Sequence, residues 1–190
     1  MHVIWYTAMS MDGRIAGPGE DLAFLETIDG SGEDGDFEAV LADVDGVVVG
    51  GGTMRWLHAQ GHDLPATNHG PVWLVSHDEE LAERMAAANP TVPVTRDEGD
   101  VAAIFERMST AGHQRVWLCG GGDLAGQALA TDLVDEVIMT IAPMALGSGP
   151  ALFDHPAVPQ RVFTLAECRE YGSGSVRLRW LRVREAAETT

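Results

Sequence analysis

Lysine is absent from this chain, and all twelve basic residues are arginines. The absence excludes a Walker-type phosphate lysine, a Schiff-base lysine and a protein-kinase lysine, because each of these needs the primary amine. The arginines stand against 29 aspartates and glutamates, which gives a formal net charge of −17. Such a field repels nucleic acids and anionic membrane surfaces, so we expect neither as a partner.

Cysteines are scarce and long apolar runs are missing. Cys119 and Cys168 are far apart, and neither belongs to a C-x-x-C pair, so we expect two reduced thiols. No apolar stretch approaches the length of a membrane span, and the first residues lack the basic and apolar regions of a signal peptide. We therefore expect a cytoplasmic protein.

A histidine cluster is the one arrangement that resembles a metal site. His58, His62 and His69 follow one another closely in the chain. Gly61 and Pro65 limit the length of any helix that would place them on one face. We therefore predict no metal.

Apolar runs alternate with amphipathic segments over most of the chain, which is typical of a parallel sheet covered on both faces. The predicted strands are residues 3–9, 46–49, 72–75, 92–95, 116–119 and 136–142. The predicted helices are residues 36–42, 79–88, 101–111 and 124–131. The sequence thus predicts an α/β fold with a central sheet between two layers of helices.

The last part of the chain has a different pattern. Residues 161–171 and 175–183 predict two antiparallel strands joined by a glycine-serine-glycine turn at 172–174. In the second strand Val176, Leu178 and Trp180 alternate with arginines, as expected of a half-exposed strand. No linker interrupts the chain, so we expect a single domain over residues 1–185 and a frayed tail at 186–190.

Two apolar strands each end in three glycines and then begin a helix. The turns are Gly50, Gly51, Gly52 and Thr53 after the first, and Gly120, Gly121, Gly122, Asp123 and Leu124 after the second. Glycines let a ligand approach the backbone, and the free N–H groups of a helix start attract phosphate. Either turn alone is equally well explained as a tight strand-to-helix connection. Two in one chain indicate a phosphate-bearing cofactor.

The first strand does not end in the usual dinucleotide-binding turn. It ends in Ala8-Met9-Ser10-Met11-Asp12-Gly13, without the G-x-G-x-x-G pattern. An ordinary Rossmann dehydrogenase or methyltransferase is therefore disfavoured.

Five segments in order resemble those of a known family. They are Ser10-Met11-Asp12-Gly13-Arg14-Ile15-Ala16, Gly50-Gly51-Gly52-Thr53-Met54-Arg55, Gly120-Gly121-Gly122-Asp123-Leu124, Leu133-Val134-Asp135-Glu136 and the segment from Pro143 to Phe153. The chain is similar to the dihydrofolate-reductase-like superfamily, and within it to the C-terminal reductase domain of the bifunctional riboflavin-biosynthesis deaminase-reductases. The resemblance covers residues 3–183, nearly the whole chain.

This resemblance implies a homodimeric, NADPH-dependent reductase of a pyrimidine-type heterocycle. It implies a dihydrofolate-reductase-like three-layer fold, with a mostly parallel central sheet and an antiparallel C-terminal hairpin. The cofactor-binding residues that it implies are Ala8 for the nicotinamide, the two glycine turns with Thr53, Asp123 and Leu124 for the pyrophosphate, and Ser76 for the adenosine 2'-phosphate. We expect Ile15, Arg55 and Trp56 to border the substrate.

The chain departs from the family at Gly51, where many members carry an arginine that holds the 2'-phosphate. Arg55 or His77 would have to replace it, and NADH stays a second candidate cofactor. Two other functions stay open. One is reduction of dihydrofolate or another pterin, and the other is dinucleotide binding without catalysis.

Two carboxyl groups are candidates for the proton donor. Asp12 and Asp21 both follow the first strand, where the substrate pocket should open. The helix expected to begin near Asp21 resembles the one that carries the pterin-binding carboxylate in dihydrofolate reductases. Alternatively, Asp12 stabilises the turn before Gly13 and Asp21 caps a helix.

Overall fold

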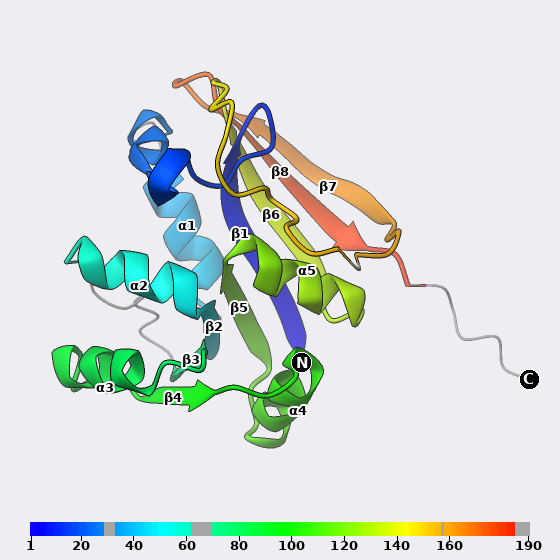
Figure 1. Ribbon diagram of the computed structural model, residues 1–190. Coiled ribbons are helices and arrows are strands. Elements are labelled where there is room, and N and C mark those ends of the chain that lie inside the picture. The colour runs from blue at the N-terminus through cyan, green and yellow to red at the C-terminus, as the bar shows by residue number, and fades with distance from the viewer. Residues whose placement is uncertain (29–32, 62–69, 157, 185–190) are drawn as a thin grey trace, which may run out of the picture.

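The computed structural model describes residues 1–28, 33–61, 70–156 and 158–184. Eight strands form one sheet in the order β4-β3-β2-β5-β1-β6-β8-β7 (Figure 1). The strands are β1 (His2–Ser10), β2 (Gly46–Gly50), β3 (Val72–Val75), β4 (Val94–Asp97), β5 (Arg115–Gly120), β6 (Glu136–Ala142), β7 (Phe163–Glu170) and β8 (Val176–Arg182). The helices are α1 (Glu33–Leu41), α2 (Gly51–Ala59), α3 (Glu79–Ala88), α4 (Val101–Thr110) and α5 (Gly122–Ala130), with two 3-10 turns, η1 (Pro18–Glu20) and η2 (Ala23–Thr27).

The sheet is parallel through its first six strands and antiparallel at its C-terminal hairpin. β1 pairs with β5 and β6, β2 with β3 and β5, and β3 with β4, all in parallel register. β8 runs antiparallel to both β6 and β7. The predicted mostly parallel sheet with an antiparallel C-terminal hairpin is confirmed.

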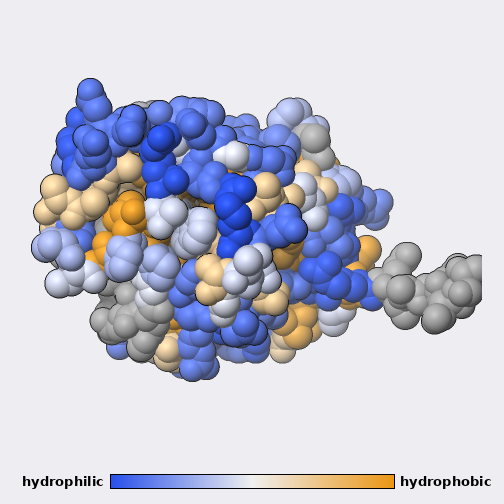
Figure 2. Space-filling view, turned by 90° about the horizontal axis from the view of Figure 1, so that it is seen from below, coloured by the Kyte–Doolittle hydropathy of each residue, from blue (hydrophilic) through white to orange (hydrophobic). Residues whose placement is uncertain are grey.

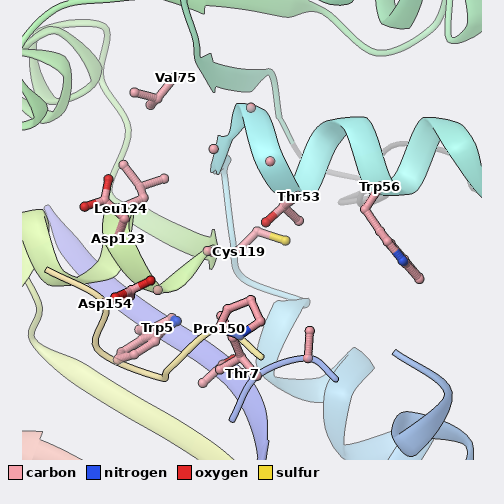
Figure 3. Close-up of a pocket in the computed structure, with 18 of the residues that line it drawn as sticks. Trp5, Thr7, Thr53, Trp56, Val75, Cys119, Asp123, Leu124, Pro150 and Asp154 are labelled. Carbon is pink, nitrogen blue, oxygen red and sulfur yellow. The ribbon is translucent and has the colours of Figure 1, made fainter. Parts of the chain in front are cut away.

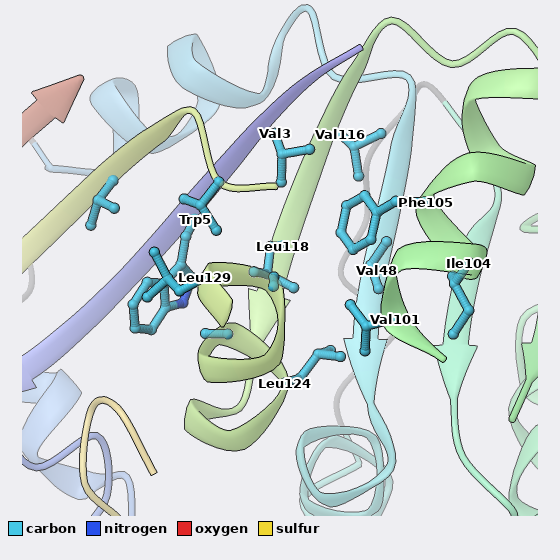
Figure 4. Close-up of a cluster of buried hydrophobic side chains, with 14 of the residues drawn as sticks. Val3, Trp5, Val48, Val101, Ile104, Phe105, Val116, Leu118, Leu124 and Leu129 are labelled. Carbon is cyan, nitrogen blue, oxygen red and sulfur yellow. The ribbon is translucent and has the colours of Figure 1, made fainter. Parts of the chain in front are cut away.

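Two hydrophobic clusters, one on each face of the sheet, hold the layers together. Ile104 and Phe105 of α4 pack with Leu124 of α5 against one face of the strands (Figure 4). Met54 of α2 and Leu81 of α3 pack against the other face. Alternate strand residues serve the two clusters, because side chains of a strand point to opposite faces in turn.

The bounds of β3, β6 and α3 agree with the prediction, and those of β4 do not. β4 begins at Val94 instead of residue 92. The Val92 N–H donates to the carbonyl of Asn89 at 3.0 Å in a turn, and Pro93 has no N–H to give to a neighbouring strand. The expected tail at 186–190 lies outside the described residues.

The expectation that the arginines of β8 lie on an exposed face is wrong for Arg177. Its side chain is buried and donates to Glu167 at 2.9 Å. The neighbouring arginines of the strand are also ion-paired, Arg179 with Glu136 and Arg182 with Asp132. Ion pairing with carboxylates offsets the cost of burying an arginine, and these partners cannot be identified from the pattern of the strand alone.

The described surface is hydrophilic over most of the face seen in Figure 2, with small hydrophobic patches. No helix in the described part of the chain is long and apolar enough to cross a membrane. A third, smaller hydrophobic cluster of Phe24, Ile28 and Ala142 lies where η2 contacts the end of β6.

A buried carboxylate joins three strands on the same sheet. The Glu136 side chain is 1% exposed and lies 2.8 Å from His2 Nε2 and 2.5 Å from Arg179 Nε. Burial opposes its ionisation, but the hydrogen bonds from His2 and Arg179 outweigh burial and lower its pKa to about 2. The ionised Glu136 of β6 therefore links β1 and β8 through His2 and Arg179.

Replacing this carboxylate by Glu136→Gln should lower the free energy of unfolding by roughly 1.5–3 kcal/mol, the range for a hydrogen bond to a charged group. A lowered carboxyl pKa stabilises the fold above the unfolded pKa, near 4.5, and this contribution is lost as pH falls toward about 2. Urea unfolding should therefore show a difference between wild type and variant at pH 7 that shrinks below pH 4.5. Glu80→Gln, on the exposed surface of α3, is the control and should leave the midpoint unchanged.

Candidate functional site

The carboxyl ends of the parallel strands open into a cleft of about 1160 Å³. Such an edge is where ligands bind in open α/β sheets. Of the residues expected at a cofactor or substrate, these line the cleft: Ala8, Ile15, Gly50, Gly51, Gly52, Thr53, Trp56, Ser76, Gly120, Gly121, Gly122, Asp123 and Leu124. The fold therefore brings the two glycine turns together at one cleft.

Both glycine turns present helix starts without a capping side chain. α2 begins after Gly50 and α5 after Gly121, and neither N-cap residue makes a side-chain hydrogen bond. Asp78 and Asp100, by contrast, cap the starts of α3 and α4 with their carboxylates. The first N–H groups of α2 and α5 are thus left for a ligand, and helix dipoles favour an anionic one.

The second turn has a backbone that favours glycine. Gly120 has φ of +129°, and the peptide bond between Gly120 and Gly121 is cis. A Cβ placed on Gly122 would lie 2.5 Å from the carbonyl oxygen of Ala151 and 2.8 Å from that of Leu152. The start of α5 therefore packs directly against the backbone of residues 151–152.

Gly51, where the sequence lacks the arginine expected from the resemblance, packs against the side chain of Ser76. A Cβ at this position would lie 2.8 Å from Ser76 Oγ and 3.4 Å from Arg55 Nη1. Ser76 Oγ is held by the N–H of Asp78 at 3.0 Å. The two residues thus occupy the space that a side chain at position 51 would need.

The first turn places two side chains of α2 toward the cleft. Thr53 and Trp56 project from one side of the helix, and Cys119 lies next to the last residue of strand β5 (Figure 3). Burial raises the pKa of the Cys119 thiol to about 12, so the group is a neutral thiol at physiological pH. Cys119 therefore offers the cleft an apolar surface instead of a nucleophile.

Asp12 joins two loops and does not line the cleft. Its carboxylate accepts hydrogen bonds from Ser10 Oγ at 2.5 Å and from the N–H groups of Leu146 at 3.0 Å and Gly147 at 2.8 Å. The hydrogen bond from Ser10, followed by those two, lowers its pKa to about 2. A carboxylate held ionised in this way is a poor proton donor, and the contacts match the turn role left open by the sequence.

Asp21 is likewise exposed and outside the cleft lining. Its carboxylate accepts from the N–H of Ala23 at 2.9 Å, at the beginning of η2. This contact is an Asx turn and not a helix cap, because the N-cap residue of η2 is Leu22, which makes no side-chain hydrogen bond. The expected helix near Asp21 is only the short 3-10 turn η2, so the feature that favoured a pterin reductase is absent from this segment of the described chain.

Arg55 does not line the cleft either. Its side chain is 58% exposed and faces Asp78 at 3.8 Å. His77 does line the cleft, beside Glu98, with 3.1 Å between its Nδ1 and the carboxylate. Among the described residues no group of three metal-binding side chains occurs, and His62 and His69 lie outside those residues.

Several cleft residues were not anticipated from the sequence. An aromatic wall is formed by Tyr6, Phe37 and Trp117, with ring centroids 5.2 Å apart for the first pair and 5.5 Å for the second. Three carboxylates that were not expected there also line the cleft, Glu20, Glu98 and Asp154, in addition to the expected Asp123. Glu98 directly follows β4, as Ser76 directly follows β3. Its position after a predicted parallel strand could therefore have identified Glu98 as a cleft residue from the sequence.

A family model and a curated relative each match nearly the whole chain. The family model of the RibD C-terminal domain matches residues 1–177. An uncharacterized protein, YwjB, of Bacillus subtilis (strain 168) is 27% identical over 180 residues, covering 94% of this chain and 97% of its own.

Solved structures share the fold. A putative riboflavin biosynthesis protein from Shewanella sp. PV-4 has a TM-score of 0.83 at 24% identity, covering 97% of this chain and 100% of its own. A diaminohydroxyphosphoribosylaminopyrimidine deaminase/5-amino-6-(5-phosphoribosylamino)uracil reductase from Thermotoga maritima has a TM-score of 0.65 at 17% identity, covering 96% of this chain and 56% of its own. These matches confirm the dihydrofolate-reductase-like fold.

Proposed function

The chain belongs to the RibD C-terminal domain family, and from that premise we propose that it is an NAD(P)H-dependent reductase of a pyrimidine-type heterocycle. The observation that carries the proposal is the pair of uncapped helix starts, α2 and α5, at one cleft. The proposed activity is of the riboflavin-pathway pyrimidine reductase type. NADPH is the form that the family resemblance implies, and NADH is the second candidate.

The described residues fit a dinucleotide. The first N–H groups of α2 and α5 would hold its pyrophosphate, since both helix starts lack a side-chain cap. Ser76 and His77, at the end of β3, would border the adenosine, and Ala8 of β1 would border the nicotinamide. When bound, the reduced nicotinamide supplies a hydride to an electrophilic carbon of the substrate, and a proton from water completes the reduction.

The chain's own contribution is placement and exclusion of water. Ile15 and Pro150 lie on adjacent loops, joined by a hydrogen bond from the Ile15 N–H to the Pro150 carbonyl at 3.0 Å. Together with Trp56 and the aromatic wall they give the cleft apolar sides. A close, dry approach of two reactants lowers the barrier chiefly through proximity and orientation.

Titration with NADPH and with NADH tests this function directly. Trp56 and Trp117 line the cleft, so binding should quench tryptophan fluorescence, with dissociation constants in the micromolar range for at least one form. Oxidation of the cofactor in the presence of aminopyrimidines should then be detectable at 340 nm (about 1–100 turnovers per second at saturation). Binding without turnover would favour the non-catalytic module, and no binding of either form would end the reductase proposal.

A further inference from the structure

The distribution of charge in the cleft bears on what the substrate carries. All twelve arginines lie in the described part of the chain, which has no lysine, and none of them lines the cleft. The four that are nearest to cleft residues along the chain all contact other groups of the protein. Arg14 donates to the carbonyl of Gly149 at 3.0 Å, and Arg55 faces Asp78 at 3.8 Å. Arg96 is paired with the cleft residue Glu98 at 3.2 Å, and Arg115 lies 3.9 Å from Glu136.

The acidic side chains, in contrast, are spread along the cleft. Glu98 lies at the end of β4, Asp123 at the start of α5, and Asp154 on the loop beside Pro150 (Figure 3). Glu20 lies at the end of η1, with φ of 63°, a left-handed conformation that few residues other than glycine adopt. It lines the part of the cleft formed by the N-terminal segment.

That part of the cleft is otherwise apolar. Leu22, Leu25 and Ile28 line it on the segment that follows Glu20, and Phe37 and Trp117 supply aromatic rings. Side chains of this kind favour a flat, uncharged heterocycle. Glu20 is the charged residue next to these apolar side chains in the chain, and it lines the same cleft.

A phosphate ester on the substrate would meet no arginine among the described residues that line the cleft, and the histidine there, His77, lies 3.1 Å from the Glu98 carboxylate at the end of the cleft proposed for the adenosine. Phosphate recognition in proteins rests on arginine, lysine or helix-start N–H groups. The two uncapped helix starts of the cleft are those of α2 and α5, and the proposed dinucleotide uses both for its pyrophosphate. A second phosphate would therefore have to lie among carboxylates.

We propose that the substrate carries no phosphate ester and is a neutral or positively charged heterocycle that binds between the aromatic wall and Glu20. This inference rests on the proposed function and departs from the phosphoribosyl substrate that the Thermotoga protein's name describes. Glu20 is assigned as the residue that repels an anionic substituent and accepts hydrogen bonds from amino or hydroxyl groups.

Calorimetry on the full chain saturated with oxidised dinucleotide tests the proposal, because binding is then measured without turnover. The two probes are 5-amino-6-(ribitylamino)uracil and its 5'-phosphate ester. The unphosphorylated compound should bind at least about tenfold more tightly, as expected when a carboxylate lies near the added charge. Glu20→Gln should narrow this ratio, and Glu20→Arg should reverse it.

Glu106→Gln is the matched control, since Glu106 is exposed on α4 and outside the cleft lining. It should leave the ratio of the two affinities unchanged. Equal or tighter binding of the phosphate ester by the wild-type chain would overturn the proposal while leaving the reductase function intact. Failure of the chain to bind any nicotinamide dinucleotide would instead show that the proposed function itself is wrong.

Discussion

Gly122→Ala is expected to weaken dinucleotide binding by roughly tenfold or more, which corresponds to about 1.4 kcal/mol. The new methyl group would lie 2.5 Å and 2.8 Å from two carbonyl oxygens of the backbone at residues 151 and 152. Neither oxygen belongs to a flexible side chain, so the first turn of α5 has to move away from the cleft wall. Overpacking of this kind also costs about 1–3 kcal/mol of folding free energy.

A glycine outside the cleft lining separates the two effects. A Cβ on Gly70 would lie 2.0 Å from the backbone carbonyl oxygen of Asp45, and neither residue lines the cleft. Gly70→Ala should therefore lower stability while the dissociation constant for the dinucleotide stays within about threefold of wild type. Fluorescence titration and thermal unfolding of both variants measure this. Unchanged affinity in a folded Gly122→Ala variant would show that the start of α5 does not hold the pyrophosphate.

Glu98→Gln is expected to raise the affinity for NADPH relative to NADH by about tenfold, the order expected for removing one charge near a phosphate. Glu98 and Ser76 line the same end of the cleft, at the ends of β4 and β3. A hydrogen bond from His77, and then one from Arg96, lowers the pKa of Glu98, so the carboxylate is ionised at neutral pH. In the proposed binding mode its charge would oppose the 2'-phosphate that distinguishes NADPH, whereas a ribose hydroxyl of NADH would donate to it.

The amide keeps the size of the side chain and removes its charge, so that His77, which lines the cleft, no longer faces a carboxylate. Competitive titration with both cofactors measures the ratio, and Glu79→Gln on exposed α3 should not change it. Higher salt should also shrink the difference between wild type and Glu98→Gln, because exposed charges are screened. An equal change in affinity for both cofactors would place Glu98 away from the adenosine ribose.

The proton donor shows where local pattern was insufficient. Asp12 and Asp21 follow the first strand in the chain, and proximity in sequence made both candidates. In the folded chain the Asp12 carboxylate accepts hydrogen bonds from the N–H groups of Leu146 and Gly147, which are more than 130 residues away in the sequence. Asp21 holds the start of η2. Hydrogen-bond partners from distant segments cannot be read from the residues around an aspartate.

The sequence by itself determined the layered α/β fold and the position of the two glycine turns. Period-two and period-3.6 hydrophobic patterns specify which faces are buried, and a strand followed by glycines and a helix is a local signal. The carboxyl ends of parallel strands lie at the same edge of a sheet, so the sequence also predicts that the two turns lie together at that edge. The lack of lysine likewise follows from composition alone.

Only the tertiary structure decided the charge and shape of the cleft. Glu20, Glu98, Asp123 and Asp154 come from four separate segments, and their convergence depends on strand order and loop packing. The same holds for Gly51, whose proximity to Ser76 and Arg55 is set by the packing of α2 beside the end of β3. Burial, ion pairing and electrostatic repulsion act through space between segments distant in sequence, so they are fixed only when those segments are brought together.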